Sequence, residues 1–298
     1  MKNKLSLSIV IPTKDRFYQL LKTLNFLKKN IFFFNEIIIV DSSAKSKILK
    51  KKLNIYKNLN IKYYKSKPST ALQRNLGFKY VNKNNKFVMF LDDDIKFNSD
   101  AFKEMKNFIK QMHPQIIGIG FNPIEEYKNN FLEKIKNSRF FCKLNIYNSK
   151  PGIVVQSGWH TKIRNIKKNQ YVEWLHSAAS IYKIKKINSL KFDEQLGEYS
   201  YLEDVIFSYD LSKKGKLIIN SKAKFYTTNF IERNDFFFGI LEIKNRIIFI
   251  KKNNFKIKNF LLGYVFFVSK NLLTSLVNLK NIYRFLGNLI GLIYLLKK

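Results

Sequence analysis

The sequence predicts a doubly wound, mostly parallel α/β fold with helices on both faces of the sheet, followed by a helical C-terminal tail. Three features carry this prediction. Short apolar runs alternate with helical patterns from residue 7 to residue 120, which is typical of β-α-β repeats. The run 87–91 is apolar without interruption, as in a strand buried on both faces. After Glu242 no acidic residue follows, and the chain becomes rich in Leu, Ile and Lys.

The first half of the chain contains four predicted strands and the helices between them. Strands are expected at 7–11, 36–40, 61–64 and 87–91, where short apolar runs end at turn-forming residues. Helices are expected at 17–29, in the lysine-rich segment after Ser43, and from Pro68-Ser69-Thr70 onward. Because strand-to-strand crossovers are right-handed, this order gives a parallel sheet.

The second half is expected to continue the domain and then leave it. A helix is predicted at about 99–112, strands at 116–120 and near 152–156, and a helix from 201 to 211 with Gly215 as its stop. The segment 121–150 is polar and loop-like. We therefore expect a catalytic domain over 1–225 and a helical region over 226–298.

Composition restricts the partners. The net charge is +34, but only seven of the 55 basic residues are Arg, and Lys is spread along the whole chain. This distribution indicates a general compositional bias, so no specific nucleic-acid partner is expected. Attraction to anionic membranes and phosphorylated substrates remains. A single cysteine, Cys142, excludes an internal disulfide and a cysteine-based zinc site, and it fits a reducing cytoplasm.

Polar residues follow three of the predicted parallel strands, and the carboxyl edge of such a sheet is where ligands bind. Adjacent carboxylates repel one another unless a cation lies between them, and hard divalent ions prefer oxygen ligands. Mg²⁺ or Mn²⁺ bridging a diphosphate is the expected guest. The alternative is a solvated acidic turn that caps the next helix through Ser99 or Asp100. The residues concerned are Thr13, Asp15, Asp41, Asp92, Asp93 and Asp94.

A second acidic pair opens the helix predicted at 201–211. Glu203 and Asp204 fall in its first turn, where the helix dipole favours the ionised form that a general base needs. The alternative is a pair that only complements the dipole. Trp174 is expected either to stack on a bound ligand or to be a core tryptophan. His160 and His176 are expected to make ordinary polar contacts, although a histidine completing a metal's ligands remains open.

Taken in order, these segments resemble the family 2 glycosyltransferases, whose nucleotide-sugar-binding fold is of the GT-A type. The resemblance extends over roughly residues 7 to 250. The matching stretches are Ser8-Ile9-Val10-Ile11-Pro12-Thr13, Val40-Asp41-Ser42-Ser43, Arg74-Asn75-Leu76-Gly77, Asp92-Asp93-Asp94, Ala178-Ala179, Phe192-Asp193-Glu194 and Glu203-Asp204.

The resemblance implies an inverting enzyme that moves a hexosyl or N-acetylhexosaminyl group from a nucleotide-diphosphate donor to an acceptor hydroxyl. The acceptor would be a lipid-linked or surface glycan, such as capsule, O-antigen or another cell-envelope polysaccharide. Asp204 would be the base with Glu203 beside it, Asp92 and Asp94 would hold Mn²⁺ or Mg²⁺, and Trp174 and His176 would face the acceptor. The donor would be bound by Pro12, Thr13, Asp15, Arg16, Asp41, Arg74, Asp92 and Asp93.

Some residues depart from the family pattern. Ser42-Ser43 replaces a glycine common near the end of the second strand, and His176-Ser177 precedes the Ala-Ala pair. These differences concern base contacts and acceptor shape. The Q-x-x-R-W signature of processive synthases is absent, so a single addition is expected rather than polymerisation.

Two other functions remain possible at this point. A nucleotidyltransferase that makes sugar nucleotides also binds a diphosphate and a metal on a doubly wound sheet. Its first loop is usually Gly-rich, whereas Pro12-Thr13-Lys14-Asp15-Arg16 contains no glycine. The non-enzymatic alternative is a basic module that coats membranes or nucleic acid, with binding that falls steeply with salt.

The tail predicts peripheral attachment to the inner face of the plasma membrane. One helical face would carry Lys270, Thr274, Asn278, Asn281 and Asn288, with a break near Gly287, and the other would be apolar. A span over 259–279 would place Lys270 at mid-bilayer, at ~2.5–3.5 kcal/mol, and is the second choice. The other alternative, close behind membrane binding, is a helix pair packed on the catalytic domain. The apolar positions are Leu261, Leu262, Val265, Phe266, Leu272, Leu273, Leu276, Leu279, Tyr283, Leu286 and Ile290.

Overall fold

The computed structural model of the chain describes residues 4–44, 50, 52–125, 138–227, 234–276, 278 and 280–296. The chain divides into two compact units. One comprises Met1–Glu125 and Ile163–Asn229, and the other comprises Glu126–Lys162 and Phe230–Lys298. The chain therefore leaves the first unit twice, whereas the sequence suggested a single boundary near residue 225.

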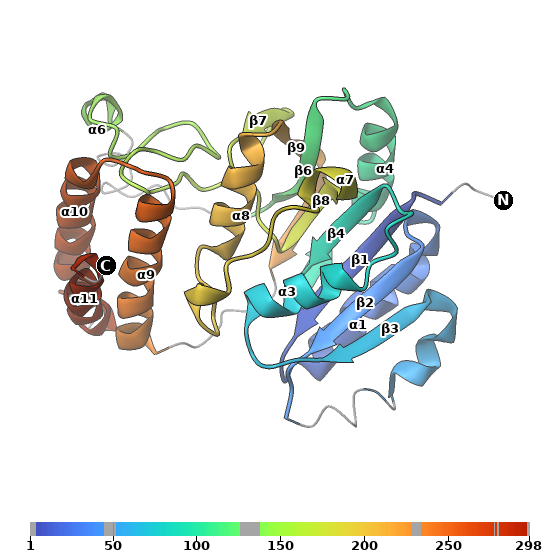
Figure 1. The fold of residues 1–298 in the computed structure, drawn as a ribbon. Coiled ribbons are helices and arrows are strands. Elements are labelled where there is room, and N and C mark those ends of the chain that lie inside the picture. Colours follow the sequence, from blue (N-terminus) through green and yellow to red (C-terminus); the bar gives the residue numbers. More distant parts are fainter. Residues whose placement is uncertain are drawn as a thin grey trace. The chain divides into compact units, whose positions relative to one another are not determined.

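The first unit is built on one mixed sheet, and its strands run in the order β3-β2-β1-β4-β8-β6-β9-β5, with β7 also paired to β9 (Figure 1). Their bounds are β1 (Leu7–Thr13), β2 (Glu36–Asp41), β3 (Ile61–Lys65), β4 (Phe87–Leu91), β5 (Ile95–Phe97), β6 (Ile116–Pro123), β7 (Gln170–Val172), β8 (Ala179–Lys183) and β9 (Lys216–Thr227).

Strand direction changes at β8. The strands β3, β2, β1 and β4 are all parallel, so their carboxyl ends meet at one edge. Strand β8 runs antiparallel to both β4 and β6, and β6 is again parallel to β9. The predicted α/β class is confirmed. The reversal places the Ala178-Ala179 segment beside the acidic end of β4, because Asp92 N–H donates to the Ala178 carbonyl oxygen at 2.9 Å.

Helices cover both faces of the sheet, because alternate strand residues point to opposite sides. Ile9 and Ile11 belong to the same apolar core as Leu24 of α1 and Phe102 of α4. Phe90 lies on the other face and meets Phe207 of α8 edge to face. The helices of this unit are α1 (Phe17–Lys29), α3 (Thr70–Lys79), α4 (Ala101–Gln111), α7 (Ile184–Ile187) and α8 (Glu203–Ser212).

Gly77 lets α3 approach the sheet closely. A Cβ atom at this position would overlap Cγ1 of Val10 and would lie 3.2 Å from Cγ2 of Val40. We expect Gly77→Ala to lower the free energy of unfolding by ~1–3 kcal/mol, the usual cost of overpacking a core. Urea denaturation measures this. The double variant Gly77→Ala/Val10→Ala should recover part of the loss, and additive losses would contradict the predicted overlap.

Two expected elements differ from the structure. The strand predicted at 152–156 is not formed, and only an isolated bridge joins Val154 to His160. The turn that follows Val155 ends the extended run, because Gly158, where φ is +77°, donates its N–H to the Val155 carbonyl oxygen at 2.8 Å. The lysine-rich helix after Ser43 lies partly outside the described residues, and the described part ends in the 3₁₀ turns Leu53–Leu59.

The second unit is helical. It contains α6 (Arg139–Lys143), α9 (Asp235–Lys252), α10 (Ile257–Ser275), α11 (Lys280–Gly291) and the 3₁₀ turn Leu292–Leu295. The predicted C-terminal helices are therefore present. Within the described ranges, no helix is both long enough and apolar enough to cross a membrane.

Candidate active site

The three adjacent aspartates after β4 have different surroundings. Asp93 is 3% exposed. Its carboxylate accepts a hydrogen bond from Thr13 Oγ1 at 2.6 Å and a longer one from Arg16 Nη1 at 3.3 Å. The Thr23 hydroxyl donates to the Asp93 carbonyl oxygen at 2.9 Å. Asp93, which the sequence analysis gave to the donor, is thus turned inward and joins the ends of β1 and β4.

Asp94 and Asp92 are more accessible, with side chains that are 11% and 34% exposed. Arg16 Nη1 donates to Asp94 Oδ2 at 2.9 Å. Burial raises the pKa of the Asp93 carboxyl to about 7, against the opposing effects of Thr13 and Arg16. Burial and the neighbouring Asp92 also raise the pKa of Asp94. Burial therefore disfavours the charged form of Asp93 and Asp94, and the repulsion between neighbouring carboxylates adds to this effect.

Arg74 connects this acidic turn to helix α8. The side chain is 3% exposed, and its Nη2 donates to Asp92 Oδ1 at 2.6 Å. Its Nη1 forms an ion pair with Glu203, the first residue of α8. The guanidinium also lies 5.7 Å from the ring centre of Phe192. A planar, forked cation can meet two carboxylates at once, so Arg74 fixes the acidic turn relative to α8.

The ends of β1 and β2 form a second wall of the site. Asp41 is fully buried, and it accepts from Ser43 N–H at 2.7 Å and from the Tyr63 hydroxyl at 2.6 Å. One oxygen thus holds the turn after β2 and the other binds Tyr63 of β3, which speaks against the predicted contact between Asp41 and the nucleoside. Pro12 is buried as well.

Asp15 remains accessible at this wall. It is exposed and adopts a left-handed backbone conformation with φ of +53°. Its N–H donates to Ser43 Oγ at 2.7 Å, and its Oδ1 accepts from Ala44 N–H at 3.2 Å. Of the donor residues predicted on the first two strands, Asp15 and the partly exposed Arg16 are the ones that a nucleotide could reach.

Gln73 is a site residue that the sequence analysis missed. It is 4% exposed, and its amide donates to the carbonyl oxygens of Thr13 and Val40, at 2.8 Å each. One side chain therefore ties together the carboxyl ends of β1 and β2. Its position next to Arg74 was the one sequence feature that pointed to the site. Nothing in the sequence indicated that its amide binds the carbonyl oxygens at the ends of β1 and β2.

The two acids at the start of α8 have separate environments. Glu203 is 7% exposed and is committed to Arg74. Asp204 is 25% exposed, and its Oδ2 lies 3.7 Å from Nδ1 of His176. Leu202, with φ of +72°, turns the backbone into the helix at this point. The structure thus separates a buried, ion-paired carboxylate from an accessible one beside a histidine.

Trp174 lies inside the protein. Its side chain is 2% exposed, and its ring packs edge to face on His176 with centres 4.5 Å apart. The neighbouring Leu175 N–H donates to Ser208 Oγ of α8 at 2.9 Å. This burial speaks against the predicted stacking of an acceptor sugar on Trp174 and favours the core alternative. His176, whose side chain is 32% exposed, still faces outward.

We expect Trp174→Phe to act on stability rather than on acceptor binding. The smaller ring leaves a void in a packed region, which costs ~1–3 kcal/mol by analogy with other large-to-small core changes. Thermal unfolding should show the loss while the acceptor KM stays near its original value. A selective rise in acceptor KM at unchanged stability would contradict this and would support a contact between Trp174 and the acceptor.

The donor set fits a divalent cation that is shared with a substrate. Among the described residues, no group of three or more His, Cys, Asp or Glu side chains is arranged to hold a metal ion. Asp92 and Asp94 supply two carboxylates, and Mg²⁺ and Mn²⁺ sites of this kind take their other oxygens from substrate phosphates and water. Arg16 and Arg74 pair with four carboxylates, so acidic side chains outnumber the two arginines in this cluster. They are Asp92, Asp93, Asp94 and Glu203.

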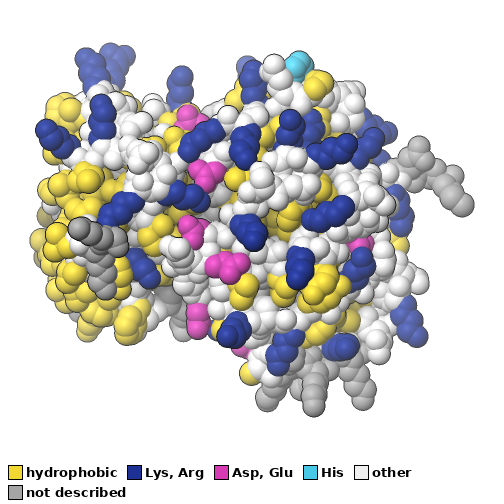
Figure 2. Space-filling model, in the orientation of Figure 1, with side chains coloured by type: hydrophobic (Ala, Val, Ile, Leu, Met, Phe, Trp, Pro, Cys, Tyr) yellow, Lys and Arg dark blue, Asp and Glu magenta, His cyan; other side chains and the backbone are white. Residues whose placement is uncertain are grey.

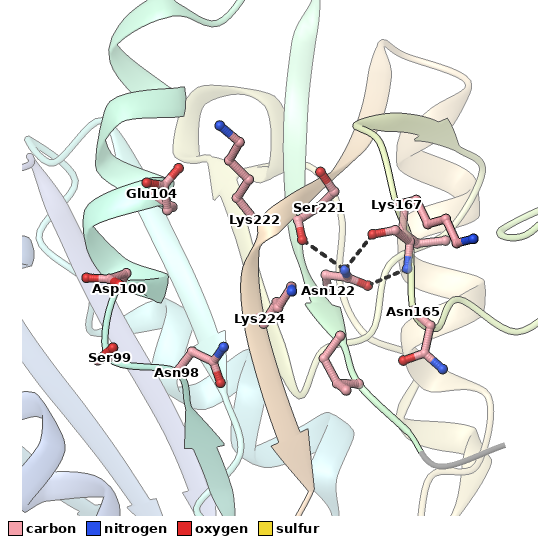
Figure 3. Close-up of a pocket in the computed structure, with 12 residues that line it drawn as sticks. Asn98, Ser99, Asp100, Glu104, Asn122, Asn165, Lys167, Ser221, Lys222 and Lys224 are labelled. Atoms are coloured by element: carbon pink, nitrogen blue, oxygen red, sulfur yellow. Dashed lines mark hydrogen bonds between the residues drawn. The ribbon is translucent and has the colours of Figure 1, made fainter.

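A hollow of about 680 Å³ lies elsewhere in this unit, beside α4 and β9 (Figure 3). None of the candidate site residues lines it. Asn122 lies at its centre and is satisfied by Ile166 N–H and by the carbonyl oxygens of Ile166 and Ser221. Its lysines, Lys167, Lys222 and Lys224, are exposed side chains. This hollow is a feature of the fold, separate from the acidic cluster.

The comparisons with known proteins define the class. The chain has the GT-A fold of glycosyltransferases, since it resembles two solved enzymes of this fold. S. aureus TarS 1–349 in complex with UDP-GlcNAc is 17% identical, with a TM-score of 0.53 over 82% of this chain and 66% of that one. The mannosyltransferase PcManGT from Pyrobaculum calidifontis, in complex with GDP-Man and Mn2+, is 10% identical, with a TM-score of 0.59 over 99% and 88%.

The family follows from the sequence. The profile described as Glycosyl transferase family 2 matches residues 8–166, more than half of the chain. The protein belongs to the family 2 glycosyltransferases, as its motifs predicted. This membership favours glycosyl transfer over the nucleotidyltransferase and binding-module alternatives. No curated protein sequence matches the chain. The chain spans less than two thirds of the length of the TarS structures it matches, 65% and 66% of TarS 1–349 and 43% of TarS.

Proposed function

We propose that the protein is an inverting glycosyltransferase that moves a sugar from a nucleotide-diphosphate donor to an acceptor hydroxyl. The observation that supports this most is that the carboxylates form two separate groups with different surroundings. Asp92 and Asp94 lie at the carboxyl edge of the parallel strands, and Asp204 opens α8 beside His176. Arg74 links the two groups through Asp92 and Glu203. In-line displacement at a sugar carbon needs a base on one face and charge stabilisation on the other.

Asp94 and Asp92 would hold Mg²⁺ or Mn²⁺ together with the donor diphosphate. When bound, the cation neutralises the charge of the departing diphosphate. The raised pKa of Asp94, which burial and Asp92 cause, is consistent with a carboxylate placed to meet a cation. Asp15 and Arg16 are the accessible groups at the ends of β1 and β2 for the nucleotide. The Mn2+ in the PcManGT complex supports a divalent ion here as well.

Asp204 would accept the proton from the acceptor hydroxyl. It is accessible, and its position in the first turn of α8 favours the ionised form. His176 lies beside Asp204 and is partly exposed to solvent, so it would orient either the acceptor or the Asp204 carboxylate. Glu203 would hold Arg74 instead of acting as a base.

The sugar would be a hexose or an N-acetylhexosamine. The UDP-GlcNAc bound to TarS and the GDP-Man bound to PcManGT support a nucleotide sugar as the donor. We further propose a single addition to a lipid-linked or surface glycan, such as capsule, O-antigen or another cell-envelope polysaccharide, on the cytoplasmic side of the plasma membrane.

A panel of nucleotide sugars in thermal-shift experiments with Mn²⁺ tests the donor. One or two donors should raise Tm, because a ligand at 100 times its Kd stabilises by about 2.7 kcal/mol. EDTA should cancel the shift. Slow hydrolysis of the same donor, with inversion at the released sugar, should follow by NMR. Retention of configuration, or no shift with any donor, would contradict the proposal.

A further inference from the structure

Helix α10 exposes a face that is mostly apolar and that also carries exposed Lys258 and Ser269. Its exposed residues recur at helical spacing, so they lie along one side. Leu276 is 85% exposed and Val265 is 61% exposed, whereas polar Asn271 and Ser275 of the same helix are only 6% and 7% exposed. The apolar residues of the exposed face are Ile257, Leu261, Leu262, Val265, Leu272, Leu273 and Leu276.

Helix α11 and the turn that follows repeat this arrangement. Their exposed apolar residues are Tyr283, Leu286, Leu289, Ile290, Ile293 and Leu296. Figure 2 shows hydrophobic side chains gathered over this helical unit, with lysine and arginine side chains around them. Such a large contiguous patch is unusual on a protein surface that faces only water.

The interior of the unit contains a polar network beside apolar residues such as Ile247 and Phe249. Asn288 is fully buried, and its amide donates to the Gly239 carbonyl oxygen at 2.9 Å. It also accepts from the Asn271 amide at 2.8 Å, and its carbonyl oxygen accepts from the Tyr264 hydroxyl at 3.2 Å. The sequence analysis placed Asn288 on an outer polar face, but this network turns it inward.

Close helix packing and a buried ion pair complete the interior. Arg284 donates to both oxygens of Glu242, at 2.8 and 3.0 Å, and Glu242 is 3% exposed. A Cβ atom at Gly239 or Gly287 would overlap backbone atoms of the facing helix, so α9 and α11 meet at their backbones. Small residues and polar contacts between helices, with apolar side chains outside, are the pattern of proteins whose surroundings are lipid.

A basic rim adjoins the apolar face. Lys251, Lys252, Lys256 and Lys258 are all exposed around the turn from α9 to α10. No acidic residue follows Glu242 in the sequence, and Glu242 itself is buried. Each basic residue near an anionic bilayer contributes about 1 kcal/mol to attraction.

We propose that the outer faces of α10 and α11 dock into the interface of an anionic lipid bilayer, with the basic rim at the headgroups. A second copy of the chain fits less well as the occupant, because its matching face would bring further lysines and no carboxylate from the segment after Glu242 to meet them. An anionic bilayer complements both the apolar face and the rim. The proposal goes beyond sugar transfer and does not depend on it.

Vesicle flotation with the full-length chain tests the proposal without donor or acceptor. The vesicles contain phosphatidylcholine alone or phosphatidylcholine with phosphatidylglycerol. The intact chain should bind the mixed vesicles, and high salt should weaken this binding. Leu262→Ser/Val265→Ser/Leu273→Ser should lower the partition coefficient by about 100-fold or more, since burial of each side chain is lost. Lys251→Gln/Lys252→Gln/Lys256→Gln should lower it by at least about tenfold on the mixed vesicles only.

Each variant has a matched control in the other unit. Tyr18→Ser/Ile55→Ser removes side chains that are 74% and 71% exposed. Lys28→Gln/Lys103→Gln/Lys110→Gln removes the same charge from exposed positions of α1 and α4. Both controls should bind nearly as the intact chain does, and circular dichroism verifies that all variants fold.

Three results would overturn the proposal. In the first, Leu262→Ser/Val265→Ser/Leu273→Ser binds vesicles as well as the intact chain does. In the second, the intact chain binds neutral and anionic vesicles equally. In the third, the intact chain binds no vesicles but forms a dimer, and the same triple variant dissociates that dimer. The last result would identify a second copy as the occupant. Failure of donor turnover would leave all these readouts unchanged, so the two proposals fail separately.

Discussion

Replacing Asp94 with Asn is expected to abolish sugar transfer, with kcat reduced by about 10³-fold. Stabilisation of a leaving group by a cation is worth several kcal/mol, and each ~1.4 kcal/mol changes the rate tenfold. The fold should survive, because burial and Asp92 disfavour the ionised Asp94, so a neutral amide relieves repulsion. Steady-state kinetics and thermal unfolding with Mn²⁺ measure both effects.

A matched variant distinguishes the loss of a metal ligand from the loss of one negative charge elsewhere on the protein. Asp100→Asn removes one exposed carboxylate at the start of α4 and should leave kcat unchanged. The Mn²⁺ dependence of the donor-induced thermal shift should disappear in Asp94→Asn and persist in Asp100→Asn. Full activity of the intact enzyme in excess EDTA, or of Asp94→Asn at ordinary Mn²⁺, would refute the assignment.

Asp204→Asn should lower kcat by ~10²–10⁴-fold while donor affinity stays close to that of the intact enzyme. This range is the usual contribution of a positioned general base, and an amide cannot accept the proton. Asp204 lies at the accessible start of α8, where its Oδ2 is 3.7 Å from Nδ1 of His176, a residue assigned to the acceptor side. The expected signature is thus a fall in kcat with little change in donor Kd.

Two variants on the same helix act as controls. Asp210→Asn loses a carboxylate paired with exposed Lys213 and should behave like the intact enzyme. Glu203→Gln removes the partner of buried Arg74 and should lower Tm, because breaking a buried ion pair leaves a charge uncompensated. If Glu203→Gln retains its Tm and loses all turnover while Asp204→Asn is nearly normal, Glu203 is the base.

The first half of the fold was predictable because its signals are local. Apolar runs such as 36–40 and 87–91 mark buried strands without reference to the rest of the chain, and both form as expected. The reversal of β8 depends on pairing with β4 and β6, which lie far away in sequence. The failed strand at 152–156 shows the same limit, since a strand needs a partner as well as apolar residues.

The chemistry of the site was predictable only in part. The sequence pattern predicted the acidic turn after β4 and the acidic pair at the start of α8. It did not predict which of these carboxylates form hydrogen bonds or ion pairs with other side chains. Asp93 looks like Asp92 and Asp94 in the sequence, yet Thr13 and Arg16 turn it inward. Glu203 and Asp204 differ only through Arg74, a residue more than a hundred positions away. Such distinctions depend on tertiary contacts that spacing does not encode.

The few arginines of this chain that are described below make contacts that need a guanidinium. Lysine makes up most of the basic residues, whereas Arg16 and Arg74 bridge carboxylates and Arg284 holds Glu242 with two hydrogen bonds. Arg246 is 2% exposed, donates to the Gly158 carbonyl oxygen at 2.6 Å and lies 4.5 Å from the ring centre of Trp159. Only a planar guanidinium can keep such contacts. Exchange of these arginines to lysine would conserve the charge and lose the forked, planar geometry, so it should not behave as a conservative substitution.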